Sequence, residues 1–223
     1  MNSCRVRNQK LKARCFILFL LCGLVFLSAM AVSAATPKVG TFTKWNGIDF
    51  IEIKQLFLLS DYSAIQMVAL DIKAVELPEK DDNTYEPVVN ALAAVDEVLL
   101  GAMKENLETV RIERAEAVTQ STAAPAASSP KALVIRGQVT KMNPGSAAAR
   151  MWAGGMLGGP GGSRVEIRCE VADAQTGQVL LTMKQASYKT GGGGIGGLSY
   201  DKLLRNNTKA IGKDLAKLLL RFK

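Results

Sequence analysis

The strictest pattern in this sequence is a two-residue alternation that runs from Arg164 to Asp173. Apolar side chains alternate with charged ones, at Val165, Ile167, Cys169 and Val171 against Arg164, Glu166, Arg168 and Glu170. A period of two is typical of a strand with one buried and one open face. Turn-forming residues at 173–177 separate this strand from a second one at 178–188, which predicts a β-hairpin. The fold must therefore contain a sheet with a covered face.

Two helices and three further strands are indicated around this hairpin. Pro87 suits the first turn of a helix, and apolar residues three or four apart continue to about Leu107. Ser199 can cap a final helix, whose apolar face is Leu204, Ile211, Leu215, Leu218 and Phe222. Strands are predicted at 64–76, 109–118 and 132–141, the first two joined by a right-handed crossover. The prediction is an α+β fold, a mixed sheet of about five strands with two main helices packed on it, after an N-terminal signal helix.

The N-terminal segment, residues 1–35, predicts an export signal. Basic residues come first, then an unbroken apolar run from Cys15 to Val32, then Ser33-Ala34-Ala35; the basic residues are Arg5, Arg7, Lys10, Lys12 and Arg14. The apolar run is also close to the shortest length that spans a bilayer, so an uncleaved inner-membrane anchor is the alternative. Lipidation at Cys22 is disfavoured because Leu20-Leu21 precede it. The expected location is periplasmic or envelope-associated.

Removal of the signal changes both charge and cysteine content. Residues 1–35 carry five basic and no acidic residues, so the remainder has 23 Lys and Arg against 20 Asp and Glu, a net charge of about +3 instead of +8. A net charge this small does not indicate the concentrated basic surface that nucleic-acid binding requires. Cys169 is then the sole cysteine, and an apolar core must stabilise the fold without a disulfide.

The predicted domain organisation follows the same boundaries. Residues 1–35 are the signal peptide and residues 36–63 an N-terminal extension whose pattern fits neither period cleanly. Residues 64–223 form a single α+β domain. Within it lie a flexible linker at 119–131 and glycine-rich loops at 145–162 and 191–197.

Few residues are candidates for chemistry. The sequence contains no histidine, the commonest general base and metal ligand. Cys169 shares the apolar face of its strand, and Asp81-Asp82 is too small a group of acids for a calcium cage. The pairs Ser129 with Lys131 and Ser187 with Lys189 lack the spacing of a known nucleophile motif. We therefore predict no catalytic residue, no metal site, no cofactor and no small-molecule substrate.

The glycine-rich stretch at 145–162 has three interpretations. The first, a phosphate-binding loop, is disfavoured because the stretch lacks the G-x-x-x-x-G-K-[ST] spacing. The other two are a contact with a partner or a membrane surface, and a structural loop in which glycine fits unusual backbone dihedrals. Large apolar side chains in such a loop must be buried against something. The candidate partner contacts are Arg150, Met151, Trp152, Met156 and Leu157.

Two segments carry a resemblance to a known family. The first runs from Leu77-Pro78 through Asp81-Asp82-Asn83-Thr84-Tyr85 to Pro87. The second begins with Gly137 to Thr140, continues through Gly145, Arg150 and the paired glycines 154–155 and 158–159, and ends at Asp173, Thr176 and Gly177. Together they resemble domain of unknown function family 4410, over roughly residue 60 onward. The resemblance implies a bacterial envelope protein, often a predicted lipoprotein, with an α/β domain after an export signal; it brings no catalytic residues.

The leading hypothesis is an exported, non-catalytic envelope protein that acts as a binding or assembly module. Its partner would be an unidentified envelope protein or a membrane surface. One alternative is a membrane-associated or oligomerising protein that uses the loop 145–162. A weaker alternative is an envelope hydrolase.

Overall fold

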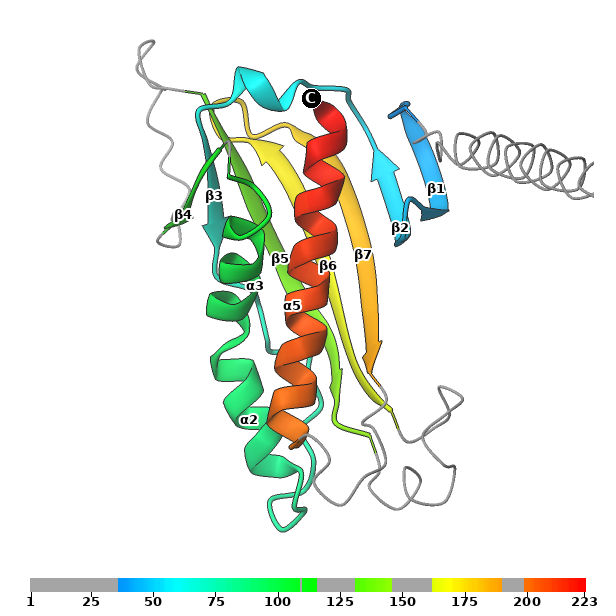
Figure 1. Ribbon diagram of the computed structural model, residues 1–223, viewed down its shortest axis with the longest axis vertical. Coiled ribbons are helices and arrows are strands. Elements are labelled where there is room, and N and C mark those ends of the chain that lie inside the picture. Colours follow the sequence, from blue (N-terminus) through cyan, green and yellow to red (C-terminus); the bar gives the residue numbers. More distant parts are fainter. Residues whose placement is uncertain (1–35, 109, 116–130, 146–161, 190–198) are drawn as a thin grey trace, which may run out of the picture. The chain divides into compact units, whose positions relative to one another are not determined.

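The computed structural model describes residues 36–108, 110–115, 131–145, 162–189 and 199–223 (Figure 1). The chain divides into two compact units, Met1–Ala35 and Thr36–Lys223, and the described residues all belong to the second. The signal peptide predicted at 1–35, the linker and the glycine-rich loops, apart from their outermost residues, lie outside the described residues. Among the described residues, no helix is both long and apolar enough to cross a membrane.

A seven-stranded mixed sheet forms one layer of this unit. The strands are β1 (Gly40–Trp45), β2 (Ile48–Ile53), β3 (Ala64–Val68), β4 (Arg111–Ala115), β5 (Ala132–Asn143), β6 (Ser163–Asp173) and β7 (Val179–Lys189). Their order in the sheet is β1-β2-β7-β6-β5-β3-β4. β3 runs parallel to both β4 and β5, and the remaining neighbours are antiparallel. The predicted hairpin is β6–β7.

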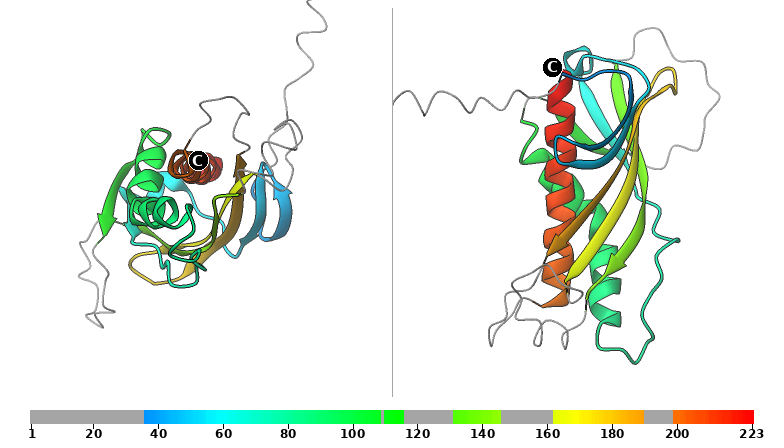
Figure 2. Two further views of the ribbon diagram at one scale, coloured as in Figure 1. Left: turned by 90° about the horizontal axis from the view of Figure 1, so that it is seen from below. Right: turned by 90° about the vertical axis from the view of Figure 1, so that its right-hand side faces the viewer.

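Three α-helices form the second layer, on one face of the sheet (Figure 2). They are α2 (Tyr85–Ala93), α3 (Val95–Lys104) and α5 (Tyr200–Leu219), with short 3-10 turns η1 (Leu59–Asp61) and η2 (Leu220–Phe222). The predicted α+β class is confirmed. The predicted cap is also confirmed, since the Ser199 hydroxyl accepts a hydrogen bond from the Lys202 amide at 3.4 Å.

The sheet is larger than predicted, and one predicted helix is two. All five predicted strands are present, but β1 and β2 add a hairpin from residues 40–53, whose pattern the prediction left unassigned. The helix expected from Pro87 to Leu107 breaks at Ala94. Asp96, in the first turn of α3, accepts a hydrogen bond from the Leu70 amide at 2.9 Å and pairs with Arg114 at 3.0 Å. These contacts fix the start of α3 independently of α2.

The strand predicted at 64–76 ends early. β3 stops at Val68, and beyond it Asp71 alone bridges to β5: its amide donates to the Gly137 carbonyl at 2.9 Å, and its carbonyl accepts from the Val139 amide at 2.8 Å. The chain therefore leaves β3 alongside β5. This path carries residues 74–84 toward the end of β5.

The core lies between the sheet and the helices. On β6, Val165, Ile167, Cys169 and Val171 are all fully buried, which confirms the predicted face. They meet the apolar side of α5, where Leu204, Ile211 and Leu215 are equally buried. The opposite face of β6 is less open than predicted, because Glu166 is only 7% exposed.

Burial of Cys169 gives a prediction for both its reactivity and the stability of the fold. Burial raises the pKa of the Cys169 thiol from 9.0 to about 12. The thiol should resist alkylation in the native protein at pH 8 and react fully in denaturant. A folded-state pKa above the unfolded value contributes stability that is complete below about pH 9 and is lost as the pH rises toward about 12.

Thermal melts across this alkaline range measure the effect, with Cys169→Ala as the comparison. The variant should lose less stability between pH 9 and 12 than the wild type does. The residual alkaline loss in the variant should include Tyr62, whose pKa is raised to about 12 by burial and by its hydrogen bond to Asp173. Fast native labelling would show that the β6 register differs from the one described.

Candidate functional site

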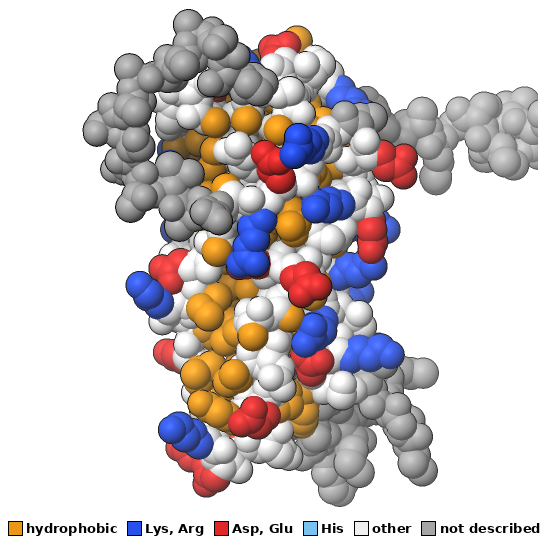
Figure 3. All heavy atoms as spheres, turned by 90° about the vertical axis from the view of Figure 1, so that its left-hand side faces the viewer, with side chains coloured by type: hydrophobic (Ala, Val, Ile, Leu, Met, Phe, Trp, Pro, Cys, Tyr) orange, Lys and Arg blue, Asp and Glu red, His pale blue; other side chains and the backbone are white. Residues whose placement is uncertain are grey.

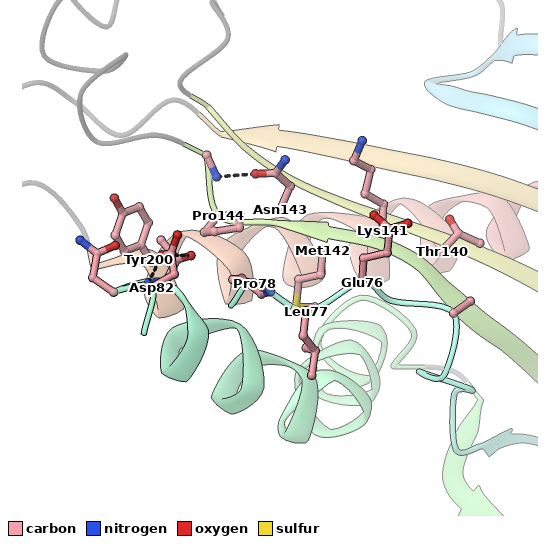
Figure 4. Close-up of a pocket in the computed structure, with 14 residues that line it drawn as sticks. Glu76, Leu77, Pro78, Asp82, Thr140, Lys141, Met142, Asn143, Pro144 and Tyr200 are labelled. Atoms are coloured by element: carbon pink, nitrogen blue, oxygen red, sulfur yellow. Dashed lines mark hydrogen bonds between the residues drawn. The ribbon is translucent and has the colours of Figure 1, made fainter. Parts of the chain in front are cut away.

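A groove opens where the two segments that carry the family resemblance come together (Figure 4). Its volume is about 980 Å³. One wall is the segment 74–84, the other is the end of β5 with Pro144 and Gly145, and Tyr200 at the start of α5 closes one end. The lining residues include Leu77, Asp82, Thr84, Lys141, Met142 and Asn143.

Asp82 on the first wall holds the start of α2. Its carboxylate accepts hydrogen bonds from the amide and the hydroxyl of Thr84, both at 2.7 Å. These bonds, the one from the hydroxyl first, lower the pKa of Asp82. The Thr84 carbonyl then accepts from the Val88 amide at 3.1 Å, inside α2. The acidic pair Asp81-Asp82 thus forms a turn at the helix start, and the described residues contain no cluster of acids, cysteine or histidine able to hold a metal ion.

The second wall is shaped by a bulge and a turn in β5. The β5–β6 register shifts between Val139 and Lys141, and Met142 is buried beyond it. At the strand end, the Asn143 side chain accepts a hydrogen bond from the Gly145 amide at 2.7 Å. Gly145 has φ of +76°, a conformation that glycine adopts without strain. Asp82 on one wall and Asn143 on the other therefore bind the backbone that frames the groove.

Glu166 lies behind this wall and is fully engaged. Its carboxylate contacts Arg164 at 2.6 Å, Lys184 at 2.8 Å and the Thr140 hydroxyl at 2.8 Å. Burial raises the pKa of Glu166, but the hydrogen bonds from Lys184 and Thr140 outweigh it, and the net pKa lies below the usual value. An ionised carboxylate with three donors is unsuited to act as a general acid near neutral pH.

The surface presented to a ligand is mixed in character. Leu77 is 48% exposed at the groove edge and Met142 forms part of the floor, with Pro78 and Pro144 beside them. Glu76 and Lys141 supply one charge of each sign on the rim. The lining contains neither histidine nor cysteine. The groove therefore presents apolar area beside one charge of each sign.

The predicted loop contacts and the serines of the two Ser-Lys pairs are not among the described residues that line the groove. The predicted partner contacts Arg150, Met151, Trp152, Met156 and Leu157 lie outside the described residues. The hydroxyl of Ser187 donates to the Asn207 side chain at 3.0 Å, so its partner is an amide rather than the Lys189 amine. Ser129 also lies outside the described residues.

Sequence reasoning missed the groove itself. Leu77 and Asn83 were named only within the family resemblance, Asp82 was also considered and rejected as a calcium ligand, and Asn143 and Tyr200 were not singled out. The useful signal was that Leu77-Pro78 and the stretch from Gly137 to Gly145 both belong to the resemblance. In the structure, the bridge from Asp71 to β5 brings these two segments side by side.

Asp173, near the end of the second segment of the resemblance, organises the β6–β7 turn. Its carboxylate accepts hydrogen bonds from the amides of Gln175 and Thr176, both at 2.9 Å, and from the Tyr62 hydroxyl at 3.1 Å. Burial raises the pKa of Asp173, but these hydrogen bonds more than offset it and leave the pKa below its usual value. Gly177 completes the turn with φ of +71°.

Comparison with known proteins confirms the family resemblance seen in the sequence. The sequence model of the family described as Domain of unknown function (DUF4410) matches residues 70–192, more than half of the chain. The chain belongs to this family. No curated protein sequence matches it.

Several solved structures are similar at low sequence identity. A PelC dodecamer from Paraburkholderia phytofirmans has a TM-score of 0.42 and 11% identity, covering 74% of this chain and 95% of that one. Protein XCC0632 from Xanthomonas campestris, of family DUF330, has a TM-score of 0.41 and 7% identity, covering 76% and 92%. Lipoprotein GNA1162 from Neisseria meningitidis has a TM-score of 0.28 and 15% identity, covering 69% and 99%.

Proposed function

We propose that this DUF4410 protein is an exported, non-catalytic envelope protein that binds a partner protein in the groove between residues 74–84 and the end of β5. The observation that carries the proposal is the groove itself, whose polar lining residues Asp82 and Asn143 are engaged in turns while Leu77 remains exposed. The turns give the groove a preformed shape, which lowers the entropic cost of binding. Export is supported by the basic, apolar and small-residue order of residues 1–35.

The groove composition favours binding over catalysis. A hydrolase would need a nucleophile with a base within hydrogen-bond reach. Asp82 in the groove lining and Glu166 behind the β5 wall each accept hydrogen bonds that hold the carboxyl pKa below its usual value. The exposed Leu77 instead supplies apolar area at the edge of the groove, where burial against a partner is favourable.

Co-isolation from the periplasmic fraction tests this proposal. Leu77→Ser should abolish recovery of an envelope protein that co-purifies with the wild type, with little effect on the melting temperature, because Leu77 is 48% exposed. Ile72→Ser is the matched control, since Ile72 is 40% exposed and does not line the groove. Undiminished recovery with Leu77→Ser would refute the groove as the binding site. Recovery of the wild type only with the inner membrane would replace the exported form with the anchored one.

The same co-isolation assay tests the partner contacts that the sequence predicts for the loop 145–162. Trp152→Ser combined with Met156→Ser should reduce recovery of the same partner if Arg150, Met151, Trp152, Met156 and Leu157 extend the contact surface from Gly145. A large fall in melting temperature would instead assign these side chains to the protein's own core.

A further inference from the structure

One face of α5 carries a regular row of cations. Lys209, Lys213, Lys217 and Arg221 are spaced four residues apart from the middle of the helix into η2, and all are exposed. Lys209 pairs with Glu105 at 2.9 Å, and nearer the start of α5 Arg205 pairs with Asp201 at 2.8 Å. Within the part of the chain that the structure describes, Lys213, Lys217, Arg221 and Lys223 form no ion pair. Positive charge thus accumulates toward the C-terminal end.

The row is not explained by the stability of the helix. Like charges four residues apart repel each other and weaken a helix. Cations in the last turn interact favourably with the helix dipole, which accounts for Lys217 and Arg221. It does not account for Lys213, which lies more than a turn earlier. Elsewhere, on the side of the unit that carries β4, α2 and α3, charges of both signs are interspersed (Figure 3).

Two exposed leucines lie beside this cationic end. Leu56 and Leu58 are 50% and 52% exposed, in the segment that links β2 to β3. Phe57, between them, stacks on the Phe222 ring of η2 with 4.4 Å between ring centroids. This contact places the leucines next to the C-terminal turn, as the views in Figures 1 and 2 show for the segment as a whole.

We propose that this C-terminal tip, formed by Leu56, Leu58, Lys213, Lys217, Arg221 and Lys223, docks on the surface of an anionic lipid bilayer. The exposed leucines can insert among the apolar acyl chains of a bilayer, and the unpaired cations beside them can bind its negatively charged headgroups. The nearby acid Asp214 accepts a hydrogen bond from Gln185 at 2.9 Å, so its carboxylate is engaged with the protein. Two further acids flank the leucines in sequence: Asp61, and Glu52, which pairs with Lys54 at 3.9 Å. The four cations of the tip, together with Lys54, outnumber these three acids.

Membrane docking at this tip leaves the groove free. The groove is closed by Tyr200 at the first residue of α5, whereas the tip extends from Lys213 to the last turn, about 20–30 Å away along the helix at a rise of about 1.5 Å per residue. A protein bound by its tip would therefore hold the groove away from the bilayer. The inference goes beyond the proposed function and depends only on its export component.

Vesicle co-sedimentation of the unit Thr36–Lys223, which contains the whole apolar core, tests the proposal. The wild type should bind vesicles of phosphatidylglycerol with phosphatidylethanolamine and not vesicles of phosphatidylcholine alone. Lys213→Gln with Lys217→Gln should weaken binding about 25-fold, since each cation near an anionic surface contributes about fivefold. Leu56→Ser with Leu58→Ser should weaken it at least about tenfold through lost apolar insertion.

A matched pair of substitutions controls for net charge. Lys80→Gln with Lys202→Gln removes two exposed cations from the other end of the unit and should leave vesicle binding within about twofold of the wild type. Absence of wild-type binding to the anionic vesicles would overturn the proposal, as would equal losses in the tip and control variants. Loss of partner-protein recovery from tip substitutions, without any vesicle binding, would make the tip a protein interface instead. Groove variants should bind vesicles normally, so each proposal fails separately.

Discussion

Replacing Gly137 with Ala is expected to lower the free energy of unfolding by about 3 kcal/mol. A Cβ atom at this position would lie 2.3 Å from the Arg168 carbonyl oxygen and 3.1 Å from the Sγ of Cys169. Gly137 pairs with Cys169 in the β5–β6 register, so relief requires the two central strands to separate. Two of the three nearest atoms belong to the backbone, and the Cys169 side chain is fully buried, so the clash is not relieved by a flexible side chain.

Chemical denaturation and thermal melts measure this loss. A loss of this size should lower the melting temperature by roughly 6–12 °C in a domain of this size. Gly101→Ala is the control, since Gly101 lies inside α3 and an added Cβ meets nothing within 4 Å. It should stabilise the protein by up to about 1 kcal/mol, because alanine favours the helix. Equal stability of Gly137→Ala and the wild type would show that the two strands are farther apart than described.

Replacing Gly212 with Leu should destabilise the fold by a similar amount, about 3 kcal/mol. Gly212 is the point where α5 crosses α3. A Cβ there would lie 2.8 Å from the Leu99 carbonyl oxygen and 2.9 Å from the Ala102 Cβ. A leucine would push the two helices apart and open the core around Leu99, which is fully buried.

Gly212→Ala separates the two opposing effects. The gain of about 1 kcal/mol in helix propensity is opposed by an overpacking cost of 1–3 kcal/mol, which leaves a net loss of about 1 kcal/mol. The order of stability should be Gly101→Ala, wild type, Gly212→Ala and Gly212→Leu, from most to least stable. A stabilised Gly212→Leu variant would contradict the close crossing of α3 and α5.

The fold could be predicted wherever periodicity was strong. The alternation through Val165, Ile167, Cys169 and Val171 identified the buried face of β6, and Ser199 identified the start of α5. The break at Ala94 has no signal in the sequence, because neither glycine nor proline marks it. It reflects tertiary hydrogen bonding of Asp96 to Leu70.

The β1–β2 hairpin did have a sequence signal. Asn46-Gly47 joins the two strands, and both residues have positive φ, +49° and +87°, as a tight hairpin turn requires. The apolar residues around it were harder to interpret, because β1 is an edge strand and several of its side chains are exposed. Gln185 then attaches the hairpin to the rest of the sheet, accepting from the Asp49 amide at 2.9 Å and donating to the Gly47 carbonyl at 3.1 Å.

The groove was beyond sequence reasoning for a different reason. Its walls come from residues 74–84, 140–145 and 200, which meet only because Asp71 bridges to β5 and α5 starts beside the same strand end. For chemistry, Asp82 was considered from sequence only as a calcium ligand, and Asn143 was not singled out; both form turns. Leu77, which is exposed at the groove, was named only as part of the segment that resembles the family.

Photo-crosslinking in cells tests the central claim most directly. A photoreactive amino acid placed at position 77, in the groove, should yield one discrete crosslinked product with an envelope protein. The same probe at position 72 should yield no such product, because Ile72 lies outside the groove although it is 40% exposed. A binding module with its partner seated between residues 74–84 and the end of β5 predicts this difference. Identical products at positions 72 and 77, or none at position 77, would contradict it.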